Sequence, residues 1–97
     1  MEPSLSVTLR YYNILRDAAG CTEEDMCVPA GTTLRALLRD TVAMEHPAVG
    51  SILLLSDGDV SPYTRLFRNG AVVWQAQLDE DLHDGDEIRL FPAVAGG

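Results

Sequence analysis

The sequence predicts an α+β domain, and three patterns carry that prediction. Apolar and polar residues alternate from Leu5 to Tyr12, which is the period of a half-buried strand. From Leu34 to Val42 the apolar residues recur at the spacing of one face of a helix. Asn69 and Gly70 stand between two apolar runs, as in the two-residue turn of a β-hairpin. A helix set among such strands indicates a mixed domain.

The first strand should turn one set of alternate side chains toward a core. This inward set is Leu5, Val7, Leu9 and Tyr11. From Asn13 to Gly20 the apolar residues lack a full helical period, so we expect a loop or a single helical turn that stops at Gly20. A second strand is expected from Thr22 to Val28, with Pro29 closing it.

The helix is the clearest element of the chain. Thr32 or Thr33 is the expected N-cap, because a side-chain oxygen there can accept a hydrogen bond from a free backbone N–H. The helix should end at His46, since Pro47 disfavours helical backbone angles for the residue before it. We interpret His46 as an exposed residue at the helix end and not as a ligand. The apolar stripe consists of Leu34, Leu37, Leu38, Thr41 and Val42.

The second half of the chain should complete a sheet. The pattern is weak from Ala48 to Ser61, where a short helix followed by a loop is the expectation. Hairpin strands are expected at 64–68 and 71–74, and an acidic connection at 75–82 should be anchored by Leu78 and Leu82, with His83 solvated. In the last strand, after a turn at 84–86, Ile88 and Leu90 should face the core.

Composition limits the class of protein. A chain of 97 residues suits one domain with a single core. No apolar run approaches the roughly 18 residues that a membrane span requires. The opening Met1-Glu-Pro-Ser4 lacks the basic and apolar regions of a secretory signal. We therefore expect a cytoplasmic protein with no membrane partner.

The net charge of −8 argues against a nucleic-acid partner, because phosphates would be repelled, and it favours basic protein partners. The acidic residues near the end of the chain form either a solvated surface or a docking surface for such a partner, and the sequence leaves both open. They are Asp79, Glu80, Asp81, Asp84, Asp86 and Glu87.

The chain contains seven arginines and no lysine, and its two cysteines are Cys21 and Cys27. These cysteines lie outside the usual metal-binding spacings, and His46 and His83 add no such spacing. We interpret both as reduced thiols without a role in a site, and we expect no metal.

Pro92 should end the last strand, because it has no N–H to donate to a neighbouring strand. The sequence thus predicts a domain at 1–91 and an extended, mobile tail at 92–97. Gly96 and Gly97 lack side chains and could pass through a channel too narrow for other residues. The terminal carboxylate is ionised at neutral pH and is a poor electrophile, so any chemistry on it requires activation. From this dipeptide alone, a frayed end is the simpler interpretation.

The residues before the glycines favour the chemical interpretation. The segments 84–88 and 90–97 resemble the ending of the ubiquitin-like sulfur-carrier proteins of the MoaD/ThiS family. Further blocks of resemblance at 7–20, 28–38 and 66–70 extend it over nearly the whole chain. The resemblance implies a β-grasp fold, in which a mixed sheet packs on one main helix. Two departures are the lack of lysine and Ala93, where many molybdopterin-type members have a second proline.

The resemblance also implies a function. Gly97 would be adenylated by a ubiquitin-activating-like adenylyltransferase, which uses ATP and Mg²⁺, and then converted to a thiocarboxylate. The chain would be a protein co-substrate, not an enzyme, with no cofactor of its own. Tyr12 and Phe91 align with family positions whose aromatic rings contact partners, although plain packing is an equal alternative. The residues that would thread into the partner are Pro92, Ala93, Val94, Ala95 and Gly96.

Leu54-Leu-Ser-Asp-Gly58, followed by the Asn-Gly hairpin, looks more like the longer cysteine-synthesis, archaeal and MoaD-like members than the compact thiamin carriers. Among these we favour the cysteine-synthesis type. Its partners would then include a PLP-dependent cysteine synthase and a JAMM-type metalloprotease that releases the product. One alternative is a MoaD-type subunit that supplies sulfur to the large subunit of molybdopterin synthase. Others are a ubiquitin-like modifier attached to lysines of other proteins, and a binding module with an inert tail.

Overall fold

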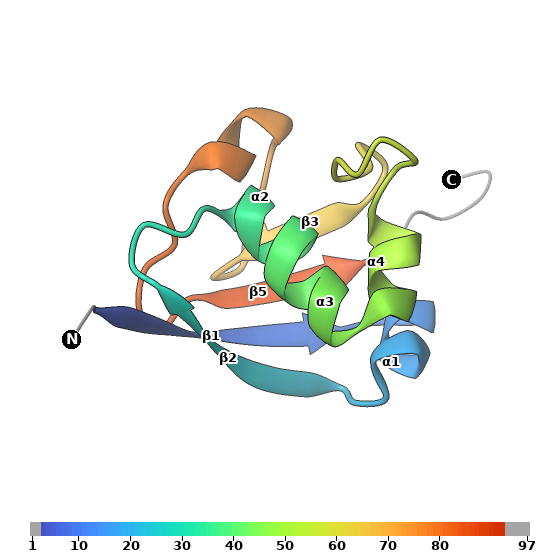
Figure 1. Ribbon diagram of the computed structural model, residues 1–97, viewed down its shortest axis with the longest axis horizontal. Coiled ribbons are helices and arrows are strands. Elements are labelled where there is room, and N and C mark those ends of the chain that lie inside the picture. The colour runs from blue at the N-terminus through green and yellow to red at the C-terminus, as the bar shows by residue number, and fades with distance from the viewer. Residues whose placement is uncertain (1–2, 93–97) are drawn as a thin grey trace.

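The computed structural model describes residues 3–92, which form a five-stranded mixed sheet with the main helix across one of its faces (Figure 1). The strands occur in the order β2-β1-β5-β3-β4. Strand β1 pairs antiparallel with β2 and parallel with β5, which pairs antiparallel with β3. This arrangement confirms the expected α+β fold of the β-grasp type. The strands are β1 (Ser4–Tyr11), β2 (Glu23–Pro29), β3 (Arg65–Arg68), β4 (Ala71–Val72) and β5 (Glu87–Phe91).

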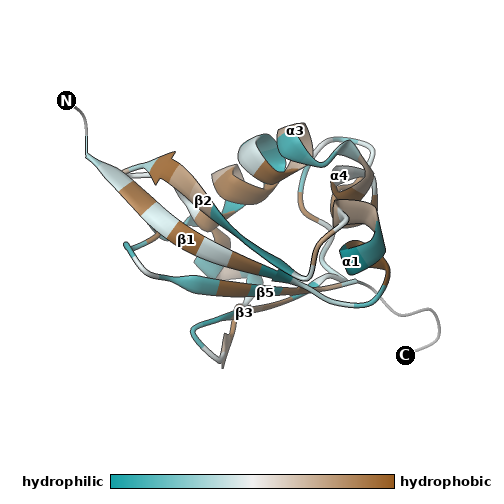
Figure 2. Ribbon diagram, turned by 90° about the horizontal axis from the view of Figure 1, so that it is seen from below, coloured by the Kyte–Doolittle hydropathy of each residue, from teal (hydrophilic) through white to brown (hydrophobic). Residues whose placement is uncertain are grey.

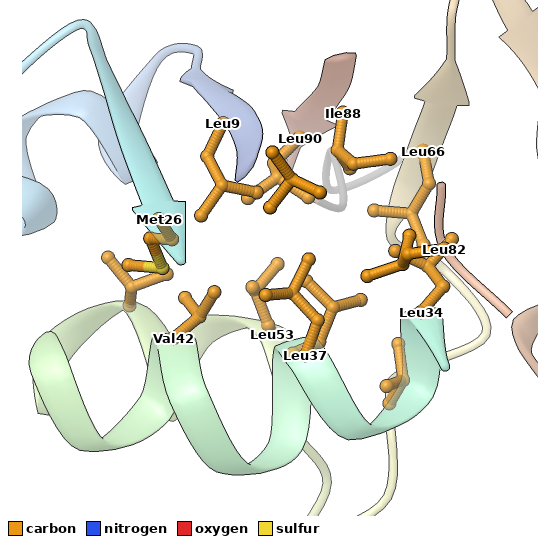
Figure 3. Packing of buried hydrophobic residues seen from close by; sticks show 14 of the residues in the cluster. Leu9, Met26, Leu34, Leu37, Val42, Leu53, Leu66, Leu82, Ile88 and Leu90 are labelled. Atoms are coloured by element: carbon orange, nitrogen blue, oxygen red, sulfur yellow. The ribbon is translucent and has the colours of Figure 1, made fainter. Parts of the chain in front are cut away.

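The main helix runs through three consecutive segments, and the middle one, η1, has the wider π-helical winding. Thr33 caps it as expected, since its Oγ1 accepts a hydrogen bond from the Ala36 N–H at 3.1 Å. Leu37 and Val42 point from the helix toward Leu9 and Leu90 of the sheet (Figure 3). The helical segments are α1 (Ile14–Ala19), α2 (Leu34–Ala36), η1 (Leu37–Val42), α3 (Ala43–Glu45), α4 (Pro47–Leu53) and the 3₁₀ helix η2 (Gln75–Asp79).

The sheet buries the side chains that the alternation predicted. Along β1 the ribbon alternates between apolar and polar bands (Figure 2), and Val7 and Leu9 are fully buried. Ile88 and Leu90 are also fully buried in β5. With the helix they form one core, which Leu78 and Leu82 join from the connection before β5. Burial of this apolar surface drives the assembly of the domain.

The two segments with weak sequence patterns, 13–20 and 48–61, both contain the short helices that were among the expectations for them. Within 13–20 the residues Ile14–Ala19 form the short helix α1, with Gly20 as its C-cap, and most of the weak segment 48–61 is the rest of α4, which ends at Leu53, followed by a loop. Asn69 and Gly70 both have positive φ angles, 52° and 86°, as the type I′ turn requires. No helix in the described part of the chain is long and apolar enough to cross a membrane.

The interpretation of His46 as an exposed residue is wrong. Its side chain is only 18% exposed, and its Nε2 lies 2.6 Å from Glu24 Oε1. The ring of Tyr11 packs edge-on against the imidazole, with 5.8 Å between the ring centroids. The helix does end at His46, but α4 starts immediately at Pro47, so the histidine sits between two helices and against β2.

A second correction concerns Asp86, which was expected to belong to a surface cluster of acids but is only 5% exposed. Its carboxylate accepts hydrogen bonds from the His83 backbone N–H (2.8 Å), Asn69 Nδ2 (2.9 Å) and Arg68 Nε (2.9 Å). Its backbone carbonyl accepts from the Thr8 N–H at 2.9 Å. Asp86 thus joins the start of β5 to both the hairpin and β1.

Burial by itself would raise the pKa of Asp86. The hydrogen bonds from His83, Asn69 and Arg68 outweigh that effect and hold the pKa below its ordinary value of 3.8. At pH values above the ordinary pKa, the ionised carboxylate therefore stabilises the folded protein. This contribution is lost as the pH falls through the lower pKa of the folded state.

We predict that Asp86→Asn lowers the free energy of unfolding at neutral pH by about 2 to 4 kcal/mol, because Arg68 loses a buried anionic partner. The difference from the wild type should begin to shrink as the pH falls below 3.8, where this carboxyl protonates in the unfolded chain, and should vanish below the lower pKa of the folded state. Urea unfolding over a series of pH values measures both effects. Asp81→Asn removes the same charge from an exposed side chain and should cost less than about 0.5 kcal/mol. Equal losses for the two variants would contradict the assigned role.

Candidate functional site

A groove of about 720 Å³ opens beside the point where the chain leaves the sheet. One wall is the β3–β4 hairpin with the stretch that follows it, and another is the end of β5. We call it the tail groove, and its walls include Pro62, Phe67, Val72, Trp74, Phe91 and Pro92. Its lining is mainly apolar, which suits the apolar surface of a partner.

Three aromatic rings form a cluster next to this groove. Tyr12 stacks on Phe91 with 4.2 Å between centroids, and Phe67 meets Phe91 edge-on at 5.5 Å. The register explains the cluster, because the buried residues Leu66 and Leu90 alternate with Phe67 and Phe91 on neighbouring strands. Tyr12 follows β1 directly, and its N–H donates to the Leu90 carbonyl at 3.2 Å.

The cluster supports both interpretations of Tyr12 and Phe91. The two rings pack against one another, and both are half-buried. Phe91 also forms part of the groove wall and so remains available for contact. Packing and recognition are therefore compatible at this position.

Phe67, Val72 and Trp74 line the site although the sequence did not indicate them as site residues. Trp74 is 66% exposed and Val72 is 42% exposed, although both line the groove. The Trp74 backbone is held in place, because its N–H donates to Gln77 Oε1 at 2.7 Å. An exposed tryptophan on a fixed backbone is typical of an anchor for a partner. The period-two spacing of Val72 and Trp74 was the available signal, but it was interpreted as a strand that in fact ends at Val72.

Arginines of this chain pair with much of the acidic cluster near its end. Four of the six carboxylates form ion pairs: Asp79 with Arg35, Glu80 and Asp86 with Arg68, and Glu87 with Arg10 and Arg89. This pairing leaves less unbalanced negative charge for a basic partner than the sequence suggests.

Five of the six residues predicted for the tail lie beyond the part of the chain that the structure describes. These are Ala93, Val94, Ala95, Gly96 and Gly97. Pro92, which we assigned to the tail, is buried and lines the groove. Pro92 is the last described residue, so the chain reaches the tail groove at the point where the description ends.

Residues 9–97 match the ThiS family. The chain belongs to this family. Small archaeal modifier protein 3 of Haloferax volcanii is 31% identical, over 96% of this chain and 100% of that protein. The crystal structure of SAMP1 from the same organism is 30% identical with a TM-score of 0.82, covering 95% of this chain and 99% of that one. The Amycolatopsis orientalis BexX/CysO complex contains a chain that is 26% identical with a TM-score of 0.65, covering 94% and 99%.

These similarities establish a ubiquitin-like, β-grasp member of a family of small modifiers and sulfur carriers. The named relatives are modifier proteins and not enzymes. The family match extends to residue 97 and so includes the Gly96-Gly97 ending. The tail groove and the segment that follows Pro92 are therefore the candidate functional site.

We predict that Phe91→Ala lowers the free energy of unfolding by about 2 kcal/mol, because its half-buried ring packs on Tyr12 and Phe67. Trp74→Ala should change it by no more than about 0.5 kcal/mol, since the ring is largely exposed. Chemical denaturation of both variants measures the difference. A large loss in the Trp74 variant would show that this ring belongs to the fold and not to a contact surface.

Proposed function

We propose that this chain is a sulfur carrier. Its Gly97 carboxylate is adenylated by a ubiquitin-activating-like enzyme, converted to a thiocarboxylate, and used as a sulfur donor by a biosynthetic enzyme in the cytoplasm. The observation that carries the proposal is the placement of an apolar groove at Pro92, next to a segment that ends in Gly96-Gly97. Membership of the ThiS family supports it.

The chemistry divides between this chain and its partner. A carboxylate oxygen of Gly97 attacks the α-phosphate of ATP and pyrophosphate leaves, which gives an acyl-adenylate. A sulfide sulfur then attacks the carbonyl carbon and AMP leaves, which gives the thiocarboxylate. If a persulfide sulfur attacks instead, the product is an acyl disulfide, and a thiol of the partner must then attack its outer sulfur, forming a partner disulfide and releasing the thiocarboxylate. The partner supplies the Mg-ATP site, because this sequence has no phosphate-binding glycine motif and no lysine.

The described residues contribute recognition. Trp74, Val72 and Phe91 offer an apolar surface that a partner can cover while it takes up the residues beyond Pro92. A docked body holds the reacting carboxylate at a high effective concentration near the ATP. This division of labour is why the chain is a co-substrate in the proposal and not a catalyst.

We place the sulfur recipient in cysteine synthesis, which the likeness to the CysO complex supports. The thiocarboxylate would react with an activated serine on a PLP-dependent cysteine synthase, and a JAMM-type metalloprotease would release the product. The alternative recipient is the large subunit of molybdopterin synthase. Incubating the thiocarboxylate form of this chain with each of the two enzymes, and assaying the product of each enzyme, distinguishes the two recipients.

A second function, attachment to lysines of other proteins, is supported by the relatives named small archaeal modifier proteins. It uses the same activated glycine. Since this chain has no lysine, it could not build lysine-linked chains on itself. Intact-mass analysis of the protein from its host separates the functions: an oxygen-to-sulfur increase supports the carrier, and lysine conjugates support the modifier.

We predict that deleting Gly97, or adding one alanine after it, abolishes ATP–pyrophosphate exchange by the cognate activating enzyme. The reacting carboxylate would no longer lie at the correct distance from the docked domain. Circular dichroism and thermal unfolding should be unchanged, because the core lies within residues 5–90. Exchange at the wild-type rate in either variant would contradict the mechanism.

We predict that Trp74→Ala raises the KM for this chain in the same exchange reaction about tenfold, as expected for the loss of one aromatic anchor. Met44→Ala is the matched control, because Met44 is 81% exposed on α3 and does not line the groove. Steady-state kinetics with saturating ATP measures both. Equal KM values for the two variants would show that the tail groove is not part of the surface that docks on the activating enzyme.

A further inference from the structure

Three side chains with metal-binding donors meet at one place although they come from separate segments. Cys21 lies in the turn between α1 and β2, Glu24 lies on β2, and His46 lies between α3 and α4. One donor atom from each residue lies within 4.8 Å of the others. Among residues 3–92 this is the one group of three or more such side chains that meets in this way.

We propose that Cys21, Glu24 and His46 bind a divalent transition metal, with Zn²⁺ the ion that fits best. Thiolate sulfur, imidazole nitrogen and carboxylate oxygen are the three donor types that proteins use for zinc. Metal–ligand distances of about 2.0 to 2.3 Å place the donors of a tetrahedral site about 3 to 4 Å apart. No two of the observed donor atoms are more than 4.8 Å apart. Any pair above this range needs to close by up to about 1 Å, whereas His46 Nε2 and Glu24 Oε1, now 2.6 Å apart, must separate by a similar amount. Water can take the fourth position.

The surroundings of the three donors support a site. The Tyr11 hydroxyl donates to Glu24 Oε1 at 2.6 Å, and the Tyr11 ring packs on His46, so one buried residue orients two of the donors. The side chains of His46 and Glu24 are 18% and 27% exposed. An ion could therefore enter from solvent and still be mostly shielded from it.

Metal binding replaces an existing hydrogen bond. His46 Nε2 and Glu24 Oε1 are 2.6 Å apart, which places one hydrogen between them. The ion replaces this hydrogen once the two side chains have moved apart, the neutral imidazole carries its hydrogen on Nδ1, and the Cys21 thiol gives its proton to solvent. Tyr11 can keep its hydrogen bond to Glu24. The bound ion would tie the α1–β2 turn to the end of the main helix.

Titration with Co²⁺ tests the proposal, because a cobalt–thiolate bond produces a charge-transfer absorption that identifies a cysteine ligand. The absorption should appear in the wild type and in Cys27→Ser, which removes the exposed thiol of β2, and should be absent from Cys21→Ser. His46→Gln and Glu24→Gln should weaken binding about tenfold or more. Zn²⁺ should raise the melting temperature of the wild type but not that of Cys21→Ser.

The histidine rings provide a second measurement that needs no variant. Adding Zn²⁺ to the wild-type protein should shift the NMR signals of the His46 ring and leave those of exposed His83 unchanged. No charge-transfer absorption, absorption that survives in Cys21→Ser, absorption lost only in Cys27→Ser, or a shift confined to His83 would each overturn the proposal. In those cases Glu24 and His46 form a structural hydrogen bond only.

Discussion

The carboxylate of Asp86 is the interaction on which the functional end of this domain depends. It holds the start of β5 against the β3–β4 hairpin through Arg68 and Asn69, while its backbone joins β1. Strand β5 then ends at Phe91, and Phe91 and Pro92 both line the tail groove. Because β5 is only five residues long, its first residues fix the position of its last ones. The placement of the groove thus follows from a buried acid at the opposite end of the strand.

The groove shows how a small domain can combine stability with recognition. Phe91 packs on its neighbours and still forms a wall of the groove, whereas Trp74 is held by its backbone and leaves its ring exposed. The first residue serves the fold and the surface together, and the second serves the surface alone. The contributions of the two rings to stability and to partner binding can therefore be measured separately.

The sequence predicted the elements that depend on local patterns. Alternation placed Leu9 and Leu90 in the core, helical spacing placed Leu37 and Val42 opposite them, and Asn69-Gly70 gave the hairpin. It could not show which of six similar acids is buried, since Asp86 is distinguished only by donors that reach it from His83, Arg68 and Asn69. The same limit applies to the meeting of Cys21, Glu24 and His46, because their separation along the chain matches no known spacing. The proposed role of the tail follows from the family resemblance. The structure contributes the position of Pro92, the first residue of the predicted tail, in the wall of the groove.

The parallel pairing of β1 with β5 has a consequence for the synthesis of the protein. The strand that emerges first from the ribosome can complete its central ladder only with the strand made last, and Ser6 and Asp84 are already 78 residues apart where they bond. Such distant contacts form late in folding. A chain that stops before residue 87 would lack the middle of its sheet and would be open to proteases. The topology thus favours survival of those copies that extend at least to the end of β5 at Phe91, immediately before the tail.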